Sequence, residues 1–235
     1  MARLVFDIET VGENFNKLDE ITQDFLTRWI KKEAENEKDY KKELENLKNG
    51  MGFSPFTGEI VVIGVLDYEK NRGMVYFQAP NKEIDDFEEN GIRFKRMTEA
   101  EMLGKFWDGA LEYNEFISYS GRGFDVPFMM IRSAIHKIRP TKDLMSNRYL
   151  FSQKYDAKHV DLADQLSFYG ARKRESLHLC TRAFGIKSPK TEGVTGDDVG
   201  RLFKEGKYED IAKYNRNDLI ATRDLYAYWE KYLKL

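Results

Sequence analysis

The positions of apolar and polar residues along the chain predict several short strands. Runs of β-favouring apolar residues, each closed by polar or turn residues, are typical of such strands. The predicted strands cover residues 3–9, 59–67, 74–77, 116–120 and, more weakly, 159–162. A turn containing Gly73 separates the second and third runs, which indicates a β-hairpin. Three strands therefore precede most of the helical patterns.

Other segments carry apolar residues at helical spacing. They cover residues 18–47, 98–111, 126–136, 174–184 and 206–233, and Lys and Glu dominate the second half of the first segment. Thr98 and Glu101 form a capping-box pattern, and Pro127 fits a first helical turn. The order of elements predicts an α/β fold: a mixed β-sheet flanked by helices, with a charged helical insertion at about residues 13–50 after the first strand.

Composition limits the class of protein. The 235 residues are 41% hydrophobic and 33% charged, enough to bury a sizeable core, and no Pro/Gly/Ser-rich linker divides them. We therefore expect a single domain over residues 1–235. No apolar run approaches the roughly 18 residues of a membrane span. The N-terminus becomes charged too early for a signal peptide, and the single Cys180 excludes an intrachain disulfide, which favours a cytoplasmic location.

Charge is distributed unevenly. The net charge is −2, yet residues 131–190 contain 13 Lys/Arg against 5 Asp/Glu, which leaves 25 basic and 35 acidic residues elsewhere. Such a chain could hold metal ions with carboxylates and phosphates with its basic segment. A solvated basic surface without function explains the pattern equally well. Aromatic residues alternate with cations in this segment, at Phe151, Tyr155, Phe168 and Tyr169. The rings could stack on unpaired bases of a nucleic acid. A hydrophobic core covered by the long side chains of Lys and Arg explains the pattern equally well.

Four acids and one tyrosine form the candidate site. Asp7 and Glu9 are two apart on a predicted strand, so their side chains leave the same face. Tyr214 and Asp218 are four apart on a predicted helix and also share a face. Asp125 lies between a glycine-rich turn and a helix start. If the three segments meet, four carboxylates converge beside a phenol.

Clustered carboxylates stay ionised only with cations nearby, since each raises the proton affinity of the others. Ligands that are all oxygens select hard ions, so we expect two Mg²⁺ or Mn²⁺ ions per site, acting on a scissile phosphate. Tyr214 should remain protonated near neutral pH, because a free tyrosine has a pKa of about 10. It would orient the attacking water rather than deprotonate it.

Three short stretches carry a family resemblance. They are Phe-Asp-Ile-Glu-Thr at residues 6–10, Gly-Arg-Gly-Phe-Asp-Val-Pro at residues 121–127 and Tyr-Asn-Arg-Asn-Asp at residues 214–218. In this order they resemble the exonuclease motifs of the DEDD superfamily, which has a ribonuclease H-like fold. In its tyrosine, four residues before the last acid, the third stretch resembles the motif of the Tyr-type (DEDDy) branch. The chain most resembles the predicted 3′–5′ exonucleases related to the proofreading domain of family B DNA polymerases.

The resemblance implies roles for individual residues. Asp7, Glu9, Asp125 and Asp218 would be metal ligands and Tyr214 would position the water, all five being catalytic. It also implies stepwise removal of nucleoside 5′-monophosphates from the free 3′ end of nucleic acid, with single-stranded DNA favoured and RNA as the alternative. We expect substrate contacts from Thr10, Arg122 and Phe124. A strand-end hydroxyl explains Thr10 nearly as well, and an exposed turn arginine explains Arg122 equally well.

Three alternatives remain open. The enzyme could be an exoribonuclease in RNA turnover or maturation. The chain could instead be a nucleic-acid-binding module that has lost its chemistry, although the presence of all four acids and the tyrosine argues against this. Finally, the helical segment at residues 17–48 could be a docking arm for a protein partner.

Overall fold

A seven-stranded sheet forms the centre of the molecule, in a computed structural model that describes residues 2–188 and 195–234. The strand order is β4-β5-β3-β2-β1-β6-β7. The strands are β1 (Arg3–Gly12), β2 (Gly58–Asp67), β3 (Arg72–Phe77), β4 (Phe87–Glu89), β5 (Ile92–Arg96), β6 (Glu115–Ser118) and β7 (Lys158–Asp161). β1, β2 and β3 pair antiparallel, whereas β6 pairs parallel to β1 and β7 parallel to β6. The sheet is therefore mixed, as expected.

The hairpin of β4 and β5 was not predicted from the sequence. Its strands contain three and five residues, too few for an alternating pattern to stand out. The turn between them has Asn90 at φ 53° and Gly91 at φ 78°. An Asn-Gly pair favours a two-residue hairpin turn with both residues at positive φ. The dipeptide at residues 90–91 was therefore the sequence signal for this hairpin.

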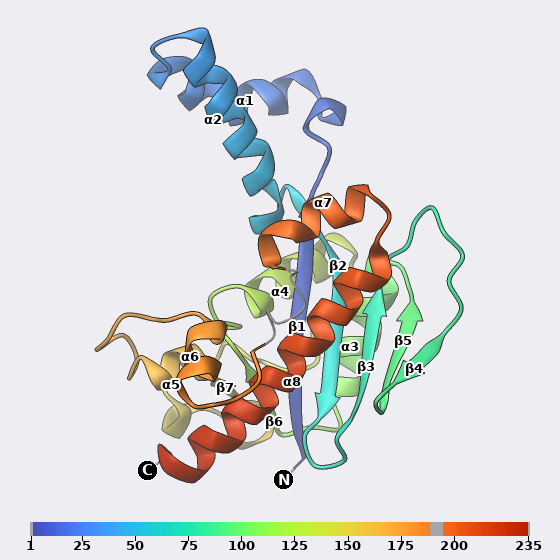
Figure 1. The fold of residues 1–235 in the computed structure, drawn as a ribbon, viewed down its shortest axis with the longest axis vertical. Coiled ribbons are helices and arrows are strands. Elements are labelled where there is room, and N and C mark those ends of the chain that lie inside the picture. Colours follow the sequence, from blue (N-terminus) through green and yellow to red (C-terminus); the bar gives the residue numbers. More distant parts are fainter. Residues whose placement is uncertain (1, 189–194, 235) are drawn as a thin grey trace.

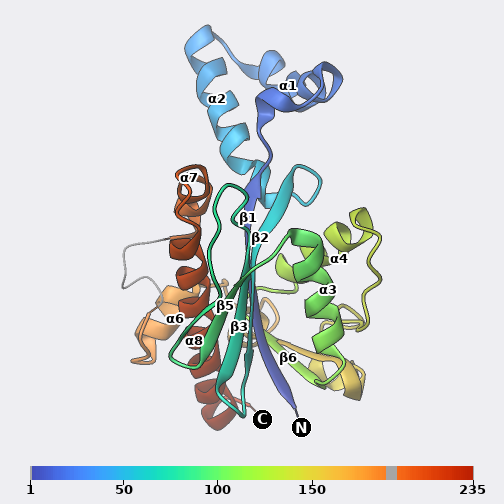
Figure 2. The same cartoon turned by 90° about the vertical axis from the view of Figure 1, so that its right-hand side faces the viewer.

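Helices cover both faces of the sheet. They are α1 (Glu20–Glu33), α2 (Glu37–Gly50), α3 (Glu99–Ala110), α4 (Asp125–Ile135), α5 (Leu162–Leu166), α6 (Leu177–Ala183), α7 (Val199–Lys204) and α8 (Tyr208–Tyr232). Figure 2 shows α3 and α4 on one face and α6, α7 and α8 on the other. The expected capping box of Thr98 and Glu101 opens α3. No described helix is long and apolar enough to cross a membrane.

Two helix boundaries differ from the prediction. Residue 174 was expected to begin a helix, but α6 begins at Leu177 because the Ser176 side chain caps it by accepting from Leu179 N–H. Residue 206 was expected to begin the last helix, but Gly206, at φ 69°, follows α7 and separates it from α8. A residue in the left-handed region commonly ends a helix.

The pleat of β1 separates two hydrophobic cores. Leu4, Phe6 and Ile8 belong to the core that contains side chains of α3 and α4. Val5 and Val11 belong to the core that contains side chains of α7 and α8. Because side chains alternate along a strand, the residues between Val5 and Val11 at odd positions face α8. Asp7 and Glu9 occupy those positions.

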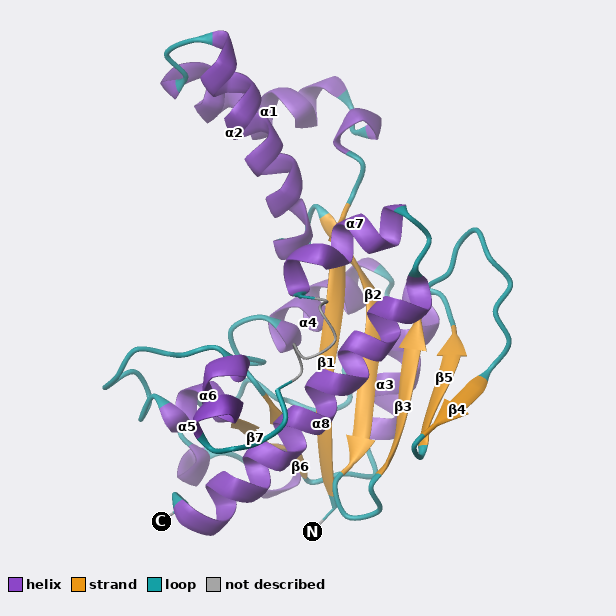
Figure 3. Cartoon of the chain, viewed as in Figure 1, coloured by secondary structure: helices purple, strands orange, loops and turns teal. Residues whose placement is uncertain are grey.

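The insertion after β1 contains two helices rather than the single one expected over residues 18–47. Asn36 breaks the helical pattern, because its side chain accepts from Asp39 N–H and caps the start of α2. The pair, labelled α1 and α2, extends away from the sheet as an arm, drawn in blue in Figure 1 and seen from the same side in Figure 3. On α1 the side chains of Ile21, Phe25 and Trp29 are exposed at four-residue spacing. The protein partner expected for this arm stays a prediction, as does the single domain.

Candidate active site

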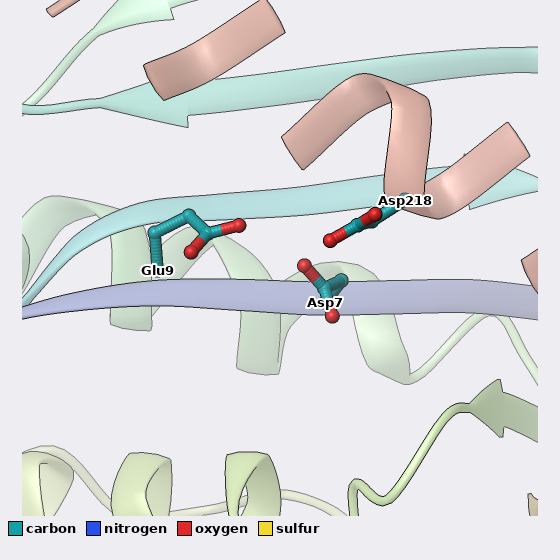
Figure 4. A group of neighbouring side chains, drawn as sticks. All are labelled: Asp7, Glu9 and Asp218. Atoms are coloured by element: carbon teal, nitrogen blue, oxygen red, sulfur yellow. The ribbon is translucent and has the colours of Figure 1, made fainter. Parts of the chain in front are cut away.

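The carboxylates of Asp7, Glu9 and Asp218 converge between β1 and α8. One oxygen from each lies within 4.8 Å of the others. Figure 4 shows the three side chains pointing toward one another, two from the strand and one from the helix. The two-residue spacing therefore places Asp7 and Glu9 on one face of β1, as predicted, and Asp218 of α8 lies beside them.

Gly64 on β2 allows α8 to lie this close to the sheet. It pairs with Asp7 in the β1–β2 register. A Cβ built on Gly64 would lie 1.9 Å from Asn215 Oδ1 and 2.7 Å from Leu219 Cδ1, both on α8. Any side chain here would displace the side chains of Asn215 and Leu219, through which α8 packs against β2.

Asn215 is a part of the site that the sequence analysis missed. Its Nδ2 donates a hydrogen bond to Asp7 Oδ2 over 2.8 Å, while its Oδ1 is buried without a hydrogen-bond partner among the described residues. The side chain is fully buried and orients the Asp7 carboxylate. A signal was present, because residues 215 and 218 are three apart on the helix and share a face.

Asp125 contacts β1 beside the cluster, through the backbone of the residue between Asp7 and Glu9. It opens α4, is 4% exposed, and accepts from Ile8 N–H over 3.1 Å. Its carboxylate does not join the group of three that lies within 4.8 Å. Burial raises the pKa of Asp125 to about 7. The same carboxylate contributes to the electrostatics of Asp7.

The pKa values of the cluster reflect buried like charges. Burial, followed by the charges of Asp125 and Glu9, raises the pKa of Asp7 well above its ordinary range. Burial and the charge of Asp218 likewise raise the pKa of Glu9. Removing water disfavours the ionised form of each acid, and each neighbour adds to that cost. A bound cation would stabilise the ionised carboxylates and lower their pKa values again. A buried set of carboxylate oxygens therefore fits Mg²⁺ or Mn²⁺.

Tyr214 lies beside the carboxylates, one helical turn before Asp218. Only 9% of the residue is exposed. Burial, the charge of Asp218 and a hydrogen bond to that carboxylate raise the pKa of Tyr214 above its ordinary value. The phenol therefore carries its proton near neutral pH and is a hydrogen-bond donor in the site.

Arg122 holds the loop that precedes Asp125. Its guanidinium donates to the carbonyls of Leu144 over 2.9 Å and Met145 over 3.3 Å. Its backbone N–H donates to Asp161, whose carboxylate also accepts from Ser120 N–H. Asp161 in addition caps α5, the role that a carboxylate at a helix start favours. Two loop carbonyls thus accept from the Arg122 guanidinium, and a contact of Arg122 with a substrate phosphate stays a prediction.

Thr10 and Phe124 lie near the edge of the site. The Thr10 hydroxyl donates to Gly52 O over 2.7 Å, which ties β1 to the base of the arm. Thr10 also lines a cavity of about 1280 Å³ bounded by the arm and α7. The ring of Phe124 contacts that of Phe53 with centroids 6.4 Å apart, and Phe53 is 65% exposed. Thr10, next to Glu9 in the sequence, thus borders the cavity, and Phe124, next to Asp125, belongs to the ring pair.

The mixed sheet, its flanking helices and the acidic cluster define an α/β protein with a ribonuclease H-like fold. The chain belongs to the family described as predicted 3′–5′ exonucleases related to the exonuclease domain of PolB, which matches residues 73–233. Asp125, Tyr214 and Asp218 lie inside the matched residues, and Asp7 and Glu9 lie before them. Membership supports nuclease activity, divalent metal use and a nucleic acid substrate in general terms.

A family B DNA polymerase from the hyperthermophilic archaeon Pyrobaculum calidifontis has a similar structure, with a TM-score of 0.60 and 15% sequence identity. The similarity covers 97% of this chain and 24% of the polymerase. The chain therefore spans about a quarter of that protein, and the likeness concerns the fold. A comparison with curated protein sequences finds no match.

Proposed function

We propose that the protein is a metal-dependent 3′–5′ exonuclease that hydrolyses phosphodiester bonds at the 3′ end of single-stranded nucleic acid, with DNA favoured. Nucleoside 5′-monophosphates would be the products. The observation that carries the proposal is the convergence of Asp7, Glu9 and Asp218 within 4.8 Å. Family membership supplies the direction of cleavage.

Four acids would hold the metal ions: Asp7, Glu9, Asp125 and Asp218. When bound, two Mg²⁺ or Mn²⁺ ions supply an activated water and stabilise the leaving oxygen. Asn215 fixes the orientation of the Asp7 carboxylate through its 2.8 Å hydrogen bond. The protonated Tyr214, bonded to Asp218, would accept a hydrogen bond from the attacking water and hold it in line with the scissile bond.

The terminal nucleotide would lie near Thr10 and Phe124. The cavity beside Thr10 is large enough for a nucleotide, and the Phe124 and Phe53 rings offer an apolar surface for a base. Arg122 would act indirectly, because its guanidinium fixes the loop before Asp125.

The test is a time course on 5′-labelled single-stranded DNA and RNA of equal sequence, with Mg²⁺, Mn²⁺ or chelator. We expect a metal-dependent ladder that shortens from the 3′ end, absent with Asp7→Ala and retained with Asp85→Ala at an exposed position. The ratio of the two cleavage rates shows whether the enzyme prefers deoxyribose or ribose. Faster cleavage of RNA would make it an exoribonuclease. Normal turnover by the Asp7→Ala protein would refute the assignment.

A further inference from the structure

A row of aromatic rings lies outside the carboxylate cluster, in the segment around β7 and α5. The rings of Tyr169 and Tyr149 are 4.8 Å apart, and those of Tyr149 and Phe151 are 6.0 Å apart, the latter pair stacked. Phe151 ends the row and is 88% exposed. Phe168 is 61% exposed. The exposure excludes a core under snorkelling cations, one of the two explanations that the sequence left open.

The segment that contains this row is rich in cations. Residues 137–174 contain nine Lys/Arg and four Asp. Two of those acids, Asp161 and Asp164, are 1% exposed. Asp164 pairs with both Arg148 and Arg174, whose side chains are 41% and 43% exposed. One buried carboxylate thus positions two half-exposed guanidinium groups, and the surface facing solvent carries an excess of positive charge.

The same contacts connect the rings to the active site. A Cβ built on Gly123, two residues before Asp125, would lie 3.6 Å from Arg174 Nη1. A Cβ built on Gly170, the neighbour of Tyr169, would lie 3.9 Å from Arg148 Nη2. The two arginines therefore bridge from the loop before Asp125 to the aromatic row.

We propose that this surface binds the single-stranded part of the substrate on the 5′ side of the scissile bond, a proposal that rests on the proposed nuclease function. Phosphates would contact Arg174 and Arg148, and an unpaired base would continue the stack on the exposed ring of Phe151. An aromatic ring can stack on any base, and contacts to phosphates do not depend on the base. The surface therefore selects unpaired strands without sequence preference. Bases within a duplex are already stacked on each other and are excluded.

The test measures fluorescence anisotropy of 5′-fluorescein-labelled oligothymidylates of 12 and 3 nucleotides, with chelator present. Phe151→Ala should weaken binding of the 12-mer about tenfold. Its effect on the 3-mer, which fills only the carboxylate end, should be smaller. Phe25→Ala on the arm, at a ring that is 67% exposed, is the matched control and should bind both as the wild type does. Phe151 is so exposed that its loss leaves folding intact.

Equal affinity of the Phe151→Ala and Phe25→Ala proteins for the 12-mer would overturn the proposal. So would an equal loss on both lengths, or a wild-type protein that does not bind the 12-mer. Failure of the proposed function is a separate result: a wild-type protein that binds the 12-mer but does not cleave it with Mg²⁺ or Mn²⁺ refutes the nuclease activity and leaves the binding surface standing.

Discussion

Asn215 on α8 donates to Asp7 on β1 across 208 positions of sequence, and this bond joins the last helix of the described chain to its first strand. The amide orients the carboxylate from behind, as hydrogen-bond partners of metal ligands generally do. The bond couples helix docking to the geometry of the candidate metal site.

Asn215→Ala should lower Mn²⁺ affinity about tenfold or more, because partners that orient ligating carboxylates typically contribute that much. The measurement is thermal unfolding over a Mn²⁺ titration, since a ligand that binds only the folded state raises the midpoint. Asn81→Ala, at an exposed loop position, is the control. An unchanged Mn²⁺ titration in the Asn215→Ala protein would remove the positioning role.

Gly64→Ala should destabilise the protein by about 1–3 kcal/mol, the usual cost of overpacking a core. The added methyl would collide with Asn215 and Leu219. Gly104→Ala in α3 is the matched control: a Cβ there meets nothing within 4 Å, so the same change should stabilise the helix by about 0.5–1 kcal/mol. Urea unfolding compares the two. Equal effects in both proteins would contradict the close approach at β2.

Tyr214→Phe should slow cleavage less than loss of a carboxylate does. The variant removes one hydrogen bond to water and keeps the metal ligands, so we expect a loss below about a hundredfold in kcat, against no detectable cleavage for Asp218→Ala. Single-turnover assays at saturating Mg²⁺ measure both. If Tyr214→Phe eliminates cleavage while Mn²⁺ still raises its unfolding midpoint, the phenol takes a direct part in proton transfer.

His159 should make the protein less stable at acidic pH. It is fully buried, its Nδ1–H donates to Leu144 O, and its Nε2 accepts from the Ser118 hydroxyl. Burial lowers the pKa of His159 to about 3. The unfolded chain takes up this proton near pH 6.5 and the folded chain near pH 3, so stability falls as pH falls between these values, by up to about 1.4 kcal/mol per pH unit.

The check on His159 is urea unfolding between pH 7 and pH 4.5. The difference in unfolding free energy between the wild type and His159→Gln should shrink as pH falls, because the variant lacks the titrating group. Asn81→Ala, at an exposed loop position without a titrating side chain, should keep a constant difference from the wild type. A constant difference for His159→Gln as well would mean that His159 does not carry this pH dependence.

Local patterns in the sequence predicted much of the candidate site. The spacing of Asp7 and Glu9 on a strand, and of Tyr214 and Asp218 on a helix, depends only on the periods of those elements. Such periods can be read from neighbouring residues. The mixed sheet and the hairpin of β2 and β3 followed from the same patterns and from the order of elements.

Long-range contacts were beyond such patterns. The Arg122 guanidinium bonds carbonyls more than twenty positions away, and the Thr10 hydroxyl bonds Gly52 across the whole arm. Both contacts depend on the path of the loops back to the sheet. The periodicity of apolar residues within one helix or strand gives no information about that path. Asn215 could be assigned to the same face as Asp218, but its bond to Asp7 required the crossing of α8 over β1.

The span between Asp7 and Asp218 also sets the moment at which the candidate metal site can form. A ribosome releases β1 first and α8 after nearly two hundred further residues, so the nascent chain carries Asp7 and Glu9 without their third carboxylate. Only docking of α8 brings the ligand set together. Chains that end before α8 therefore lack the assembled carboxylate cluster.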